Sequence, residues 1–476
     1  MGSLTALARW PWSRQPDQNG AVSAHLRLAR NLATAALVLV AVKPLADIGE
    51  GRGDGLDLGA LLTALGAVLM VAALGVFALG SRRLPPRSLL LIGAGIGLLL
   101  VLSVASYLAV DARADLLASF DVRRYSIYGP AQEATSAIPA EAMRLVVGFA
   151  PLALIGLMLL RPDWFSVRRL ALVAGVVVLG AVVHSVLAWL QVAEVIPYSF
   201  HFELAGWQKI GRASGGYFHP MSLGRLLMFS VFLVYVLGER MGVPAAVRYG
   251  LIGLFFATGV VSLHRFTILC LVLIVAVFEL RRVRTLVTAR RRGNVNRRGA
   301  LVAGGGVVVL ATLVGTLWGE AIWRRAEVVV TEVGSMDVRS DTFMHGRGAI
   351  WNDVAEILGR APIDVWLFGF GYEPWDMHND LLRLMIVWGL VGVVVTAAIL
   401  VATYRIVRGR ADRSHRTALL VLFAILVIFG LTQKPLAYPY FLWLFFFGQM
   451  VILALAPAEP DDAREASSAV TEPAAA

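Results

Sequence analysis

The chain has 476 residues, of which 58% are hydrophobic and only 16% are charged, whereas soluble domains carry about 25% charged residues. This composition excludes an ordinary soluble protein. The net charge is +11, but the basic residues separate apolar stretches and form no single patch, so we expect no nucleic-acid partner. Cys270 is the one cysteine, which excludes an intramolecular disulfide and a cysteine-based metal cluster.

Repeated apolar stretches of about twenty residues predict membrane-spanning helices. We therefore expect an all-α polytopic membrane protein with about twelve transmembrane helices. The polar, Arg-containing N-terminal segment does not predict a cleavable signal peptide. The expected spans are residues 29–48, 57–80, 88–110, 141–160, 170–192, 221–238, 248–263, 266–281, 299–318, 380–403, 417–435 and 439–456.

The basic residues predict the orientation of these spans. With twelve spans, the Arg-rich clusters between them fall on one face, which the positive-inside rule assigns to the cytoplasm. We thus expect a cytoplasmic N-terminal tail over 1–28 and a disordered cytoplasmic tail over 457–476. Helices 1–9 are expected within 29–318, a large loop on the opposite face over 319–379, and helices 10–12 within 380–456. Membrane lipid is an expected partner.

The large loop contains a predicted helix of its own. Apolar residues recur there with the spacing of a one-faced helix, at Ile350, Trp351, Val354, Ile357 and Leu358. Gly359 is expected to cap this helix, and Pro362 prevents its continuation. A tight turn over Phe368–Tyr372 then leads the chain toward the next span.

Polar residues at the start of the tenth span form the first candidate site. His378 stands where water meets lipid, and an imidazole, which titrates near neutral pH, suits proton transfer. The alternative is a histidine that merely caps a helix, although Asn379 or Asp380 could be the cap instead. Glu373 and Asp376 are close enough in the sequence to orient the imidazole or to shift its pKa, and Asp380 could do the same from the helix side.

Arginines on the same predicted face form the second candidate set. Arg265 lies between two apolar runs, where a guanidinium usually faces the bundle interior and can fork onto phosphate oxygens; snorkelling to the interface is the alternative. Arg212 begins a Gly-rich turn whose backbone N–H groups can meet an anion, or which is an ordinary re-entrant turn. Arg347 begins the loop helix and Arg339 precedes it by eight residues; a solvated charge is the alternative for both.

Two polar residues lie inside the fifth span. A polar residue in a membrane helix is a functional candidate by default. For His184 and Gln191, hydrogen bonding between helices is the commoner explanation.

Four segments of the sequence resemble the O-antigen ligase and polymerase (WaaL/Wzy) superfamily of bacterial membrane glycosyltransferases. Arg212–Pro220 resembles a family segment before a span, and Ser262–Arg265 resembles a Ser-x-Arg turn between two helices. Arg347–Trp351 followed by Gly369–Gly371 resembles part of the large periplasmic loop. The segment His378–Gly392 (HNDLLRLMIVWGLVG) is the most specific match.

This resemblance implies a GT-C-like helical bundle in the bacterial cytoplasmic (inner) membrane, with the large periplasmic loop between helices 9 and 10 and both termini cytoplasmic. It implies transfer of an undecaprenyl-diphosphate-linked glycan to a sugar hydroxyl of a glycan or lipid-core acceptor, without metal, cofactor or nucleotide sugar. His378 would activate the acceptor, and Arg265 and Arg347 would hold the diphosphate. Arg212 would be a further partner, with Arg339 as the alternative loop arginine.

Two choices stay open at the level of the sequence. An acceptor that is another lipid-linked repeat makes the protein a polymerase, and a lipid-core acceptor makes it a ligase. The alternative function is a transporter or flippase of lipid-linked oligosaccharide, which predicts an aqueous cavity between two related halves. A purely structural membrane protein leaves the Arg and His residues on one face unexplained.

Overall fold

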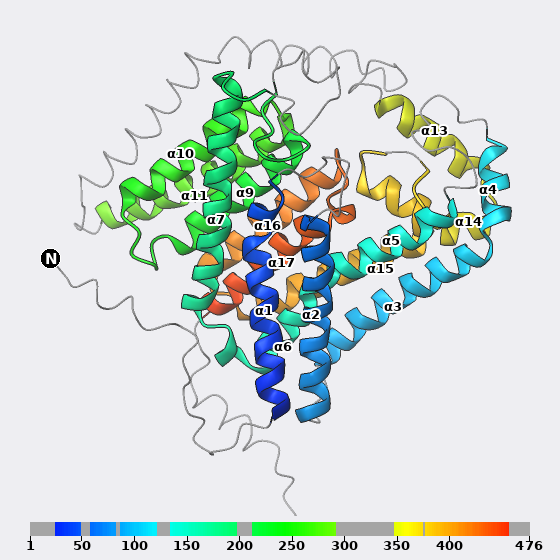
Figure 1. Cartoon of the computed structure of the whole chain (residues 1–476), viewed down its shortest axis with the longest axis horizontal. Helices are drawn as coiled ribbons and strands as arrows, with labels where there is room; N and C mark the ends of the chain where they lie inside the picture. The colour runs from blue at the N-terminus through cyan, green and yellow to red at the C-terminus, as the bar shows by residue number, and fades with distance from the viewer. Residues whose placement is uncertain are drawn as a thin grey trace, which may run out of the picture.

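The computed structural model describes residues 24–48, 58–81, 86–120, 134–197, 212–291, 347–374 and 377–456. Every regular element within these ranges is a helix (Figure 1). The helices are α1 (Ala24–Ala46), α2 (Leu58–Ser81), α3 (Arg87–Leu108), α4 (Val110–Ala118), α5 (Ala134–Phe149), α6 (Pro151–Leu160), α7 (Val167–Val192), α9 (Pro220–Leu237), α10 (Ala245–Val261), α11 (Arg265–Arg291), α13 (Arg347–Arg360), α14 (Ile363–Phe368), α15 (Asp380–Arg410), α16 (Arg413–Gly430) and α17 (Pro439–Leu455).

Eight stretches of helix in the described ranges are long and apolar enough to cross a membrane. They are α1, α2, α3, the pair α5–α6, α7, α9, α15 and α16, while α10 and α17 are shorter apolar helices. The expected all-α, multi-pass membrane architecture is therefore confirmed. Each expected span other than 299–318 overlaps a described helix. That ninth span, about half of the large loop (319–346, 375 and 376), residues 1–23 and the C-terminal tail lie outside the described residues, so the count of twelve stays a prediction. The N-terminal tail expected over 1–28 is shorter, because α1 begins at Ala24.

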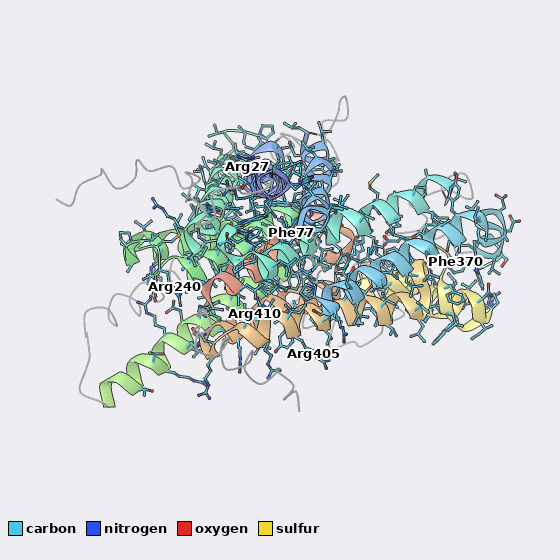
Figure 2. The ribbon with its side chains drawn as sticks, turned by 90° about the horizontal axis from the view of Figure 1, so that it is seen from below. Arg27, Phe77, Arg240, Phe370, Arg405 and Arg410 are labelled. Carbon is cyan, nitrogen blue, oxygen red and sulfur yellow. The ribbon has the colours of Figure 1, made fainter. Side chains whose placement is uncertain are left out.

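The helices extend beyond the expected spans at their Arg-rich ends. α11 continues to Arg291 instead of residue 281, and α15 continues to Arg410 instead of residue 403. Hydrophobicity marks the part of a helix that lies in lipid, whereas the backbone ladder continues through basic residues that have good helix propensity. Figure 2 shows Arg240 and Phe370 near opposite ends of the long axis of the molecule.

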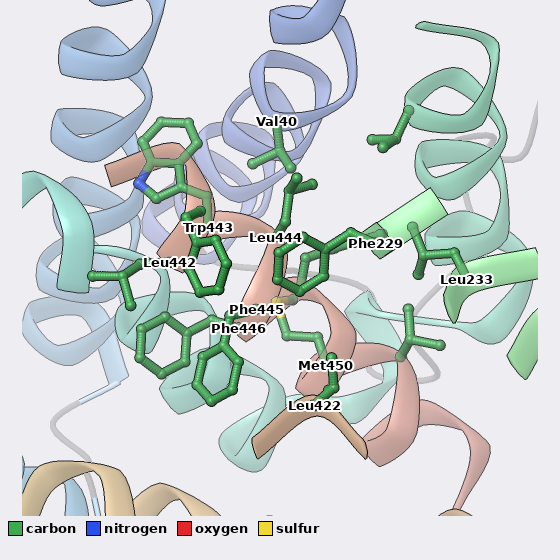
Figure 3. Packing of buried hydrophobic residues seen from close by; sticks show 14 of the residues in the cluster. Val40, Phe229, Leu233, Leu422, Leu442, Trp443, Leu444, Phe445, Phe446 and Met450 are labelled. Carbon is green, nitrogen blue, oxygen red and sulfur yellow. The ribbon is translucent and has the colours of Figure 1, made fainter. Parts of the chain in front are cut away.

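Helix α17 lies at the centre of the bundle because it is apolar on all sides. Aromatic side chains from α17 pack against α9 and α16 in the view of Figure 3. The rings of Phe229 and Phe441 meet edge to face, with centroids 5.1 Å apart. Phe445 and Leu422 are fully buried beside them. These side chains belong to one buried apolar cluster that includes residues of most of the described helices.

The predicted loop helix is α13, and it packs against the membrane helices. Val354 and Ile357 are buried in a second apolar cluster that includes Ile138 of α5 and Ile386 of α15, which confirms the predicted one-faced helix. The expected end at Gly359 is wrong, because α13 continues through it to Arg360. A solvent-facing glycine lowers helix stability without ending the ladder. Helix α14, which the sequence analysis missed, follows and lies beside α15 (Figure 1).

The turn that follows α14 is hydrogen-bonded to α15 beside a kink in that helix. Gly389 has φ 64° and ψ −163°, a combination open almost only to glycine. Just before it, the carbonyl oxygens of Ile386 and Val387 accept hydrogen bonds from the backbone N–H groups of Phe370 (2.6 Å) and Gly371 (2.9 Å). The predicted tight turn is therefore confirmed. Two of its N–H groups donate hydrogen bonds to carbonyl oxygens of α15 next to the kink.

Candidate functional site

A cavity of about 1050 Å³ lies among helix ends at one end of the bundle. Its lining comes from the end of α1, the starts of α2, α9 and α17, the turn before α11, the loop before α15, and α5. In the expected topology these helix ends lie opposite the Arg-rich clusters. The lining contains four basic side chains and one acidic side chain, namely Lys43, Arg144, Arg212, Arg225 and Asp47.

An apolar wall and three histidines complete the lining. The wall includes Met143, Val147, Phe218, Leu226, Phe441 and Leu444. The histidines are His219, His264 and His378. The cavity therefore combines cationic groups, proton-transfer groups and a surface suited to hydrocarbon.

His378 is not the residue that caps α15. Asn379 is the cap: its Oδ1 accepts a hydrogen bond from the N–H of Leu382 at 3.1 Å, and its Nδ2 donates to the carbonyl oxygen of Leu431 at 3.0 Å. His219, by contrast, caps α9 with its Nδ1, which accepts a backbone N–H at 3.0 Å. The alternative of a capping role for His378 is therefore wrong, and its side chain lines the cavity.

The backbone before His378 is held by two other segments. The N–H of Met377 donates to Oε1 of Glu373 at 3.0 Å, and the carbonyl oxygen of Met377 accepts from the indole N–H of Trp351 at 3.0 Å. His378 itself has φ 48°, a left-handed conformation that costs a residue with a side chain about 1–2 kcal/mol. Such a conformation persists where the surroundings fix it, and these hydrogen bonds fix it here.

The loop that leads to His378 is also packed against a buried apolar cluster. Tyr372 and Met377 are buried in the cluster that α13 joins. Burial raises the pKa of the Tyr372 phenol to about 12, so this side chain stays neutral at physiological pH. The loop is therefore a packed part of the structure and presents His378 at a defined place.

Glu373 and Asp380, the predicted supporting carboxylates, tie this loop to neighbouring helices. Oε2 of Glu373 lies 2.8 Å from the ammonium of Lys434 and 3.5 Å from Nε of Arg383. Oδ2 of Asp380 accepts a hydrogen bond from the N–H of Leu436 at 3.1 Å. Both carboxylates therefore act on the position of the loop and of the α16–α17 turn.

Arg383 and Glu141 complete a buried ionic network that the sequence analysis missed. They form an ion pair between α15 and α5, with side-chain exposures of 1% and 2%. Glu141 also pairs with Arg144 at 2.5 Å, and Arg144 lines the cavity. Two charged residues inside predicted apolar spans were the available signal, because such residues usually pair with one another.

Gln191 and His184 of α7 hold the Gly-rich turn. Oε1 of Gln191 accepts from the N–H groups of Ser214 (2.9 Å) and Gly215 (3.0 Å), and Nδ1 of His184 accepts from the N–H of Gly216 (3.0 Å). The expectation that these N–H groups bind an anion is therefore wrong, because side chains of α7 already occupy them. The interpretation of His184 and Gln191 as hydrogen-bonding residues is confirmed.

The contacts of His184 define the tautomer of its imidazole and connect three parts of the chain. Because Nδ1 accepts a hydrogen bond, Nε2 carries the proton and donates to the carbonyl oxygen of Pro44 at 2.7 Å. The imidazole also stacks on the ring of Tyr217, with centroids 4.0 Å apart. The end of α1 and the Gly-rich turn are thereby fixed to the same side chain.

Arg212 reaches the turn between α10 and α11. Its Nε donates to the carbonyl oxygen of Ser262 at 3.4 Å, and its side chain lines the cavity together with His378. His264 of the same turn also lines it. Arg265 begins α11 one residue later but is not among the described lining residues. The structure thus brings together His378 and Arg212, with Arg265 adjacent.

Arg225 is a further cavity cation that the sequence analysis missed. It lies in the second turn of α9 and is 8% exposed. Its guanidinium carbon is 3.5 Å from the centroid of the Tyr438 ring, a favourable cation–π contact. An arginine inside a predicted span was the available signal, as for Arg383.

The two loop arginines are placed only in part. Arg347 is the first residue of α13, and that helix is joined to the residue before His378 through Trp351. Arg339 lies outside the described residues, as does Asp376. The contribution of either arginine to the cavity stays a prediction.

The arrangement suits the binding of a phosphate-containing, partly apolar molecule beside a base. Guanidinium groups match phosphate oxygens, and the histidine is the side chain that changes protonation near neutral pH. Over the ranges that the structure covers, no group of three His, Cys, Asp or Glu side chains is arranged to hold a metal ion.

Comparison with known proteins adds no further assignment. No family model matches the chain, and no curated protein matches it.

Proposed function

We propose that this protein is a membrane glycosyltransferase of the O-antigen ligase or polymerase type. The cavity binds an undecaprenyl-diphosphate-linked glycan at the periplasmic face of the bacterial inner membrane. His378 acts as general base toward the hydroxyl of a glycan or lipid-core acceptor. The observation that carries the proposal is that His378 and Arg212, far apart in the sequence, line one cavity that also has an apolar wall.

The charge of the cavity supports a diphosphate donor. Four basic side chains and one acidic side chain line it, and two of the basic ones pair with carboxylates, Lys43 with Asp47 and Arg144 with Glu141. A diphosphate ester carries two to three negative charges. Arg–phosphate attraction is stronger where water is excluded. Arg212 and Arg225 are proposed to share the charge of the diphosphate with Arg265 and Arg347, and this charge grows as the donor bond breaks. The apolar wall suits the first isoprene units.

The proposed reaction is a single displacement. His378 accepts the proton of the acceptor hydroxyl as its oxygen attacks the anomeric carbon. The bond between that carbon and the diphosphate oxygen breaks, and its electron pair leaves with the polyprenyl diphosphate. Attack from the opposite face inverts the anomeric configuration. No metal or cofactor is required in this scheme.

The packed core favours an enzyme over the alternative, a transporter of lipid-linked oligosaccharide. A transporter needs a route that can open from one face to the other. The cavity occupies one end of the bundle, and below it Phe229, Leu233 and Phe445 are buried in a close-packed core (Figure 3). Transport of the radiolabelled donor across liposomes by the purified protein would contradict this preference.

Replacement of His378 by Ala tests the proposal. General-base assistance contributes about 10²–10⁴-fold to rate, so we expect a loss of that order in transfer from a synthetic polyprenyl-diphosphate-linked glycan, with normal membrane insertion. His25→Ala, at an exposed histidine of α1, is the matched control and should keep full activity. Glycan chain growth would identify a polymerase and transfer to a lipid core a ligase. Full activity of His378→Ala would remove this residue as the base.

A further inference from the structure

A second cavity, of about 320 Å³, lies at the other end of the bundle. Its lining comes from the end of α9, the start of α10, the second half of α11 and the start of α16. Helix α9 begins at the first cavity and ends at the second, so the two cavities lie on opposite faces. The charged residues of the second cavity are Arg240, Arg248, Arg281, Arg282, Glu239 and Glu279.

The two carboxylates of this cavity already have protein partners. Glu239, which is 65% exposed, lies 2.8 Å from Arg248 and 4.0 Å from Arg282. Oε1 of Glu279 accepts hydrogen bonds from the hydroxyls of two tyrosines, at 3.0 Å each. Four arginines against two carboxylates leave an excess of positive charge in the cavity.

The guanidinium groups are held in place by surrounding atoms. Arg281 donates to the carbonyl oxygen of Ser414 at 2.5 Å, and Arg282 donates to the hydroxyl of Tyr249. Arg248 is 13% exposed, and among the described residues its buried Nε has no hydrogen-bond partner. A guanidinium has five N–H donors, so these contacts leave donors available for another group.

We propose that this cavity binds the phosphate of an acidic phospholipid headgroup. Arginine pairs with phosphate oxygens through two parallel hydrogen bonds, and basic pockets between helices at the cytoplasmic boundary suit anionic headgroups. A lipid fits better than a soluble phosphate because apolar helix surface adjoins the arginines. Leu280 and Val283, which flank Arg281 and Arg282, are 59% and 52% exposed, where acyl chains can cover them.

The test measures lipid binding by the purified full-length protein in zwitterionic detergent, by native mass spectrometry with phosphatidylglycerol and with phosphatidylcholine. We expect preferential binding of phosphatidylglycerol. Each basic residue near the surface contributes about 1 kcal/mol to binding of an anionic lipid, or about fivefold. The double variant Arg281→Gln/Arg282→Gln should therefore bind it about 25-fold more weakly. Arg240→Gln, at an exposed position, should lose about fivefold with less risk to folding.

The matched control removes two charges from exposed positions of α15. The variant Arg405→Gln/Arg410→Gln removes two charges from the same predicted face but outside the lining of the cavity, so its loss measures the general attraction of that surface for anionic lipid. We expect this loss to be several-fold smaller than that of Arg281→Gln/Arg282→Gln, because Arg405 and Arg410 do not surround one cavity. Equal binding of the two lipids, or equal losses in the cavity and control variants, would overturn the proposal. A separate experiment adds inorganic phosphate at constant ionic strength. If phosphate displaces the lipid at a concentration comparable to that of the lipid, the cavity is a site for soluble phosphate instead. Because the readout is binding, it is independent of glycosyl transfer.

Discussion

The two walls of the larger cavity hold their candidate functional residues by different means. On one wall, the loop that carries His378 is tied by ionised groups: Glu373 pairs with Lys434 and Arg383, and Arg383 pairs with Glu141. On the other wall, neutral side chains of α7 hold the turn that carries Arg212. Both walls fix the backbone beside a functional side chain. The difference lies in what happens when one partner is removed.

Buried ions are stable in this environment only together. Taking a charge out of water is costly, and the cost is recovered only if each charge keeps its partners. A neutral amide that loses its partner leaves an unsatisfied donor or acceptor, a smaller penalty. We therefore expect the His378 wall to be far more sensitive to substitution than the Arg212 wall.

Replacement of Arg383 by Met should have the largest effect. It removes the cation that Glu141 and Glu373 share and leaves each carboxylate with one cationic partner, Arg144 and Lys434 respectively. Removing one partner from a buried pair costs about 3–5 kcal/mol, and we expect the lower end of this range because the second partners remain. We expect a loss of this size in the free energy of unfolding, measured by denaturant titration in detergent micelles. Arg405→Met, at an exposed position of the same helix, should change it by less than about 0.5 kcal/mol. Equal losses in both variants would contradict the difference between the two walls.

The helices and the candidate functional residues could be predicted from the sequence better than the contacts that hold the two walls. Apolar periodicity and length are local properties, so α13 and most membrane helices could be located within a few residues. His378 and Arg212 were candidates because an imidazole and a guanidinium suit the chemistry. That they line the same cavity follows from packing between distant segments, which no local pattern encodes.

The residues that could not be assigned a role from the sequence share one physical explanation. Arg383, Glu141 and Arg225 interrupt apolar spans, which indicates that each has a partner, but the partner lies on another helix. In the sequence, Gly389 is one of several glycines of a predicted span, and nothing local distinguishes it. Its kink is linked to a distant segment, because the turn near Phe370 donates hydrogen bonds to carbonyl oxygens of α15 just before it. The expectation of an anion at the Gly-rich turn was wrong for the same reason, since side chains of α7 accept hydrogen bonds from its N–H groups.

Replacement of Gln191 by Leu tests the neutral wall and should have an intermediate effect. It leaves the N–H groups of Ser214 and Gly215 without their acceptor, a loss of about 2 kcal/mol because each unsatisfied buried group costs about 1–3 kcal/mol and water from the cavity can compensate in part. We expect a lower free energy of unfolding and, because the turn carries Arg212, a higher KM for the lipid-linked donor.

The control for Gln191 is another buried polar residue of α7. Within the described part of the chain, the hydroxyl of Ser185 bonds only to the carbonyl oxygen of Ala181 in its own helix, at 2.7 Å. Ser185→Ala should therefore change the free energy of unfolding by less than about 1 kcal/mol and leave the KM unchanged. If Gln191→Leu costs as much stability as Arg383→Met, the distinction between ionic and neutral ties is wrong.

Replacement of Asn379 by Ala should have the smallest effect on stability and a selective effect on function. Loss of an N-cap costs about 1 kcal/mol. Asp412→Ala removes the N-cap of α16 at the other end of the bundle, where Oδ1 accepts from the N–H of His415 at 2.7 Å and lies 2.9 Å from Nδ1 of the same residue, so each of the two caps makes one further contact. Burial raises the pKa of Asp412, but the backbone hydrogen bonds from His415 and Ser414 and the imidazole of His415 together outweigh this and hold the pKa below its ordinary value. The control cap is therefore ionised at neutral pH.

The two cap variants together separate stability from positioning. Both should lower the free energy of unfolding by a similar amount at neutral pH, whereas only Asn379→Ala should reduce the rate of glycosyl transfer, because Asn379 fixes the backbone that follows His378. Asn379→Asp restores the acceptor for the N–H of Leu382 but places an oxygen where Nδ2 donates to the carbonyl oxygen of Leu431, so it should recover only part of the stability. Equal transfer rates in the two alanine variants would mean that the position of His378 does not depend on its cap, and that the loop before it is sufficient to hold the imidazole.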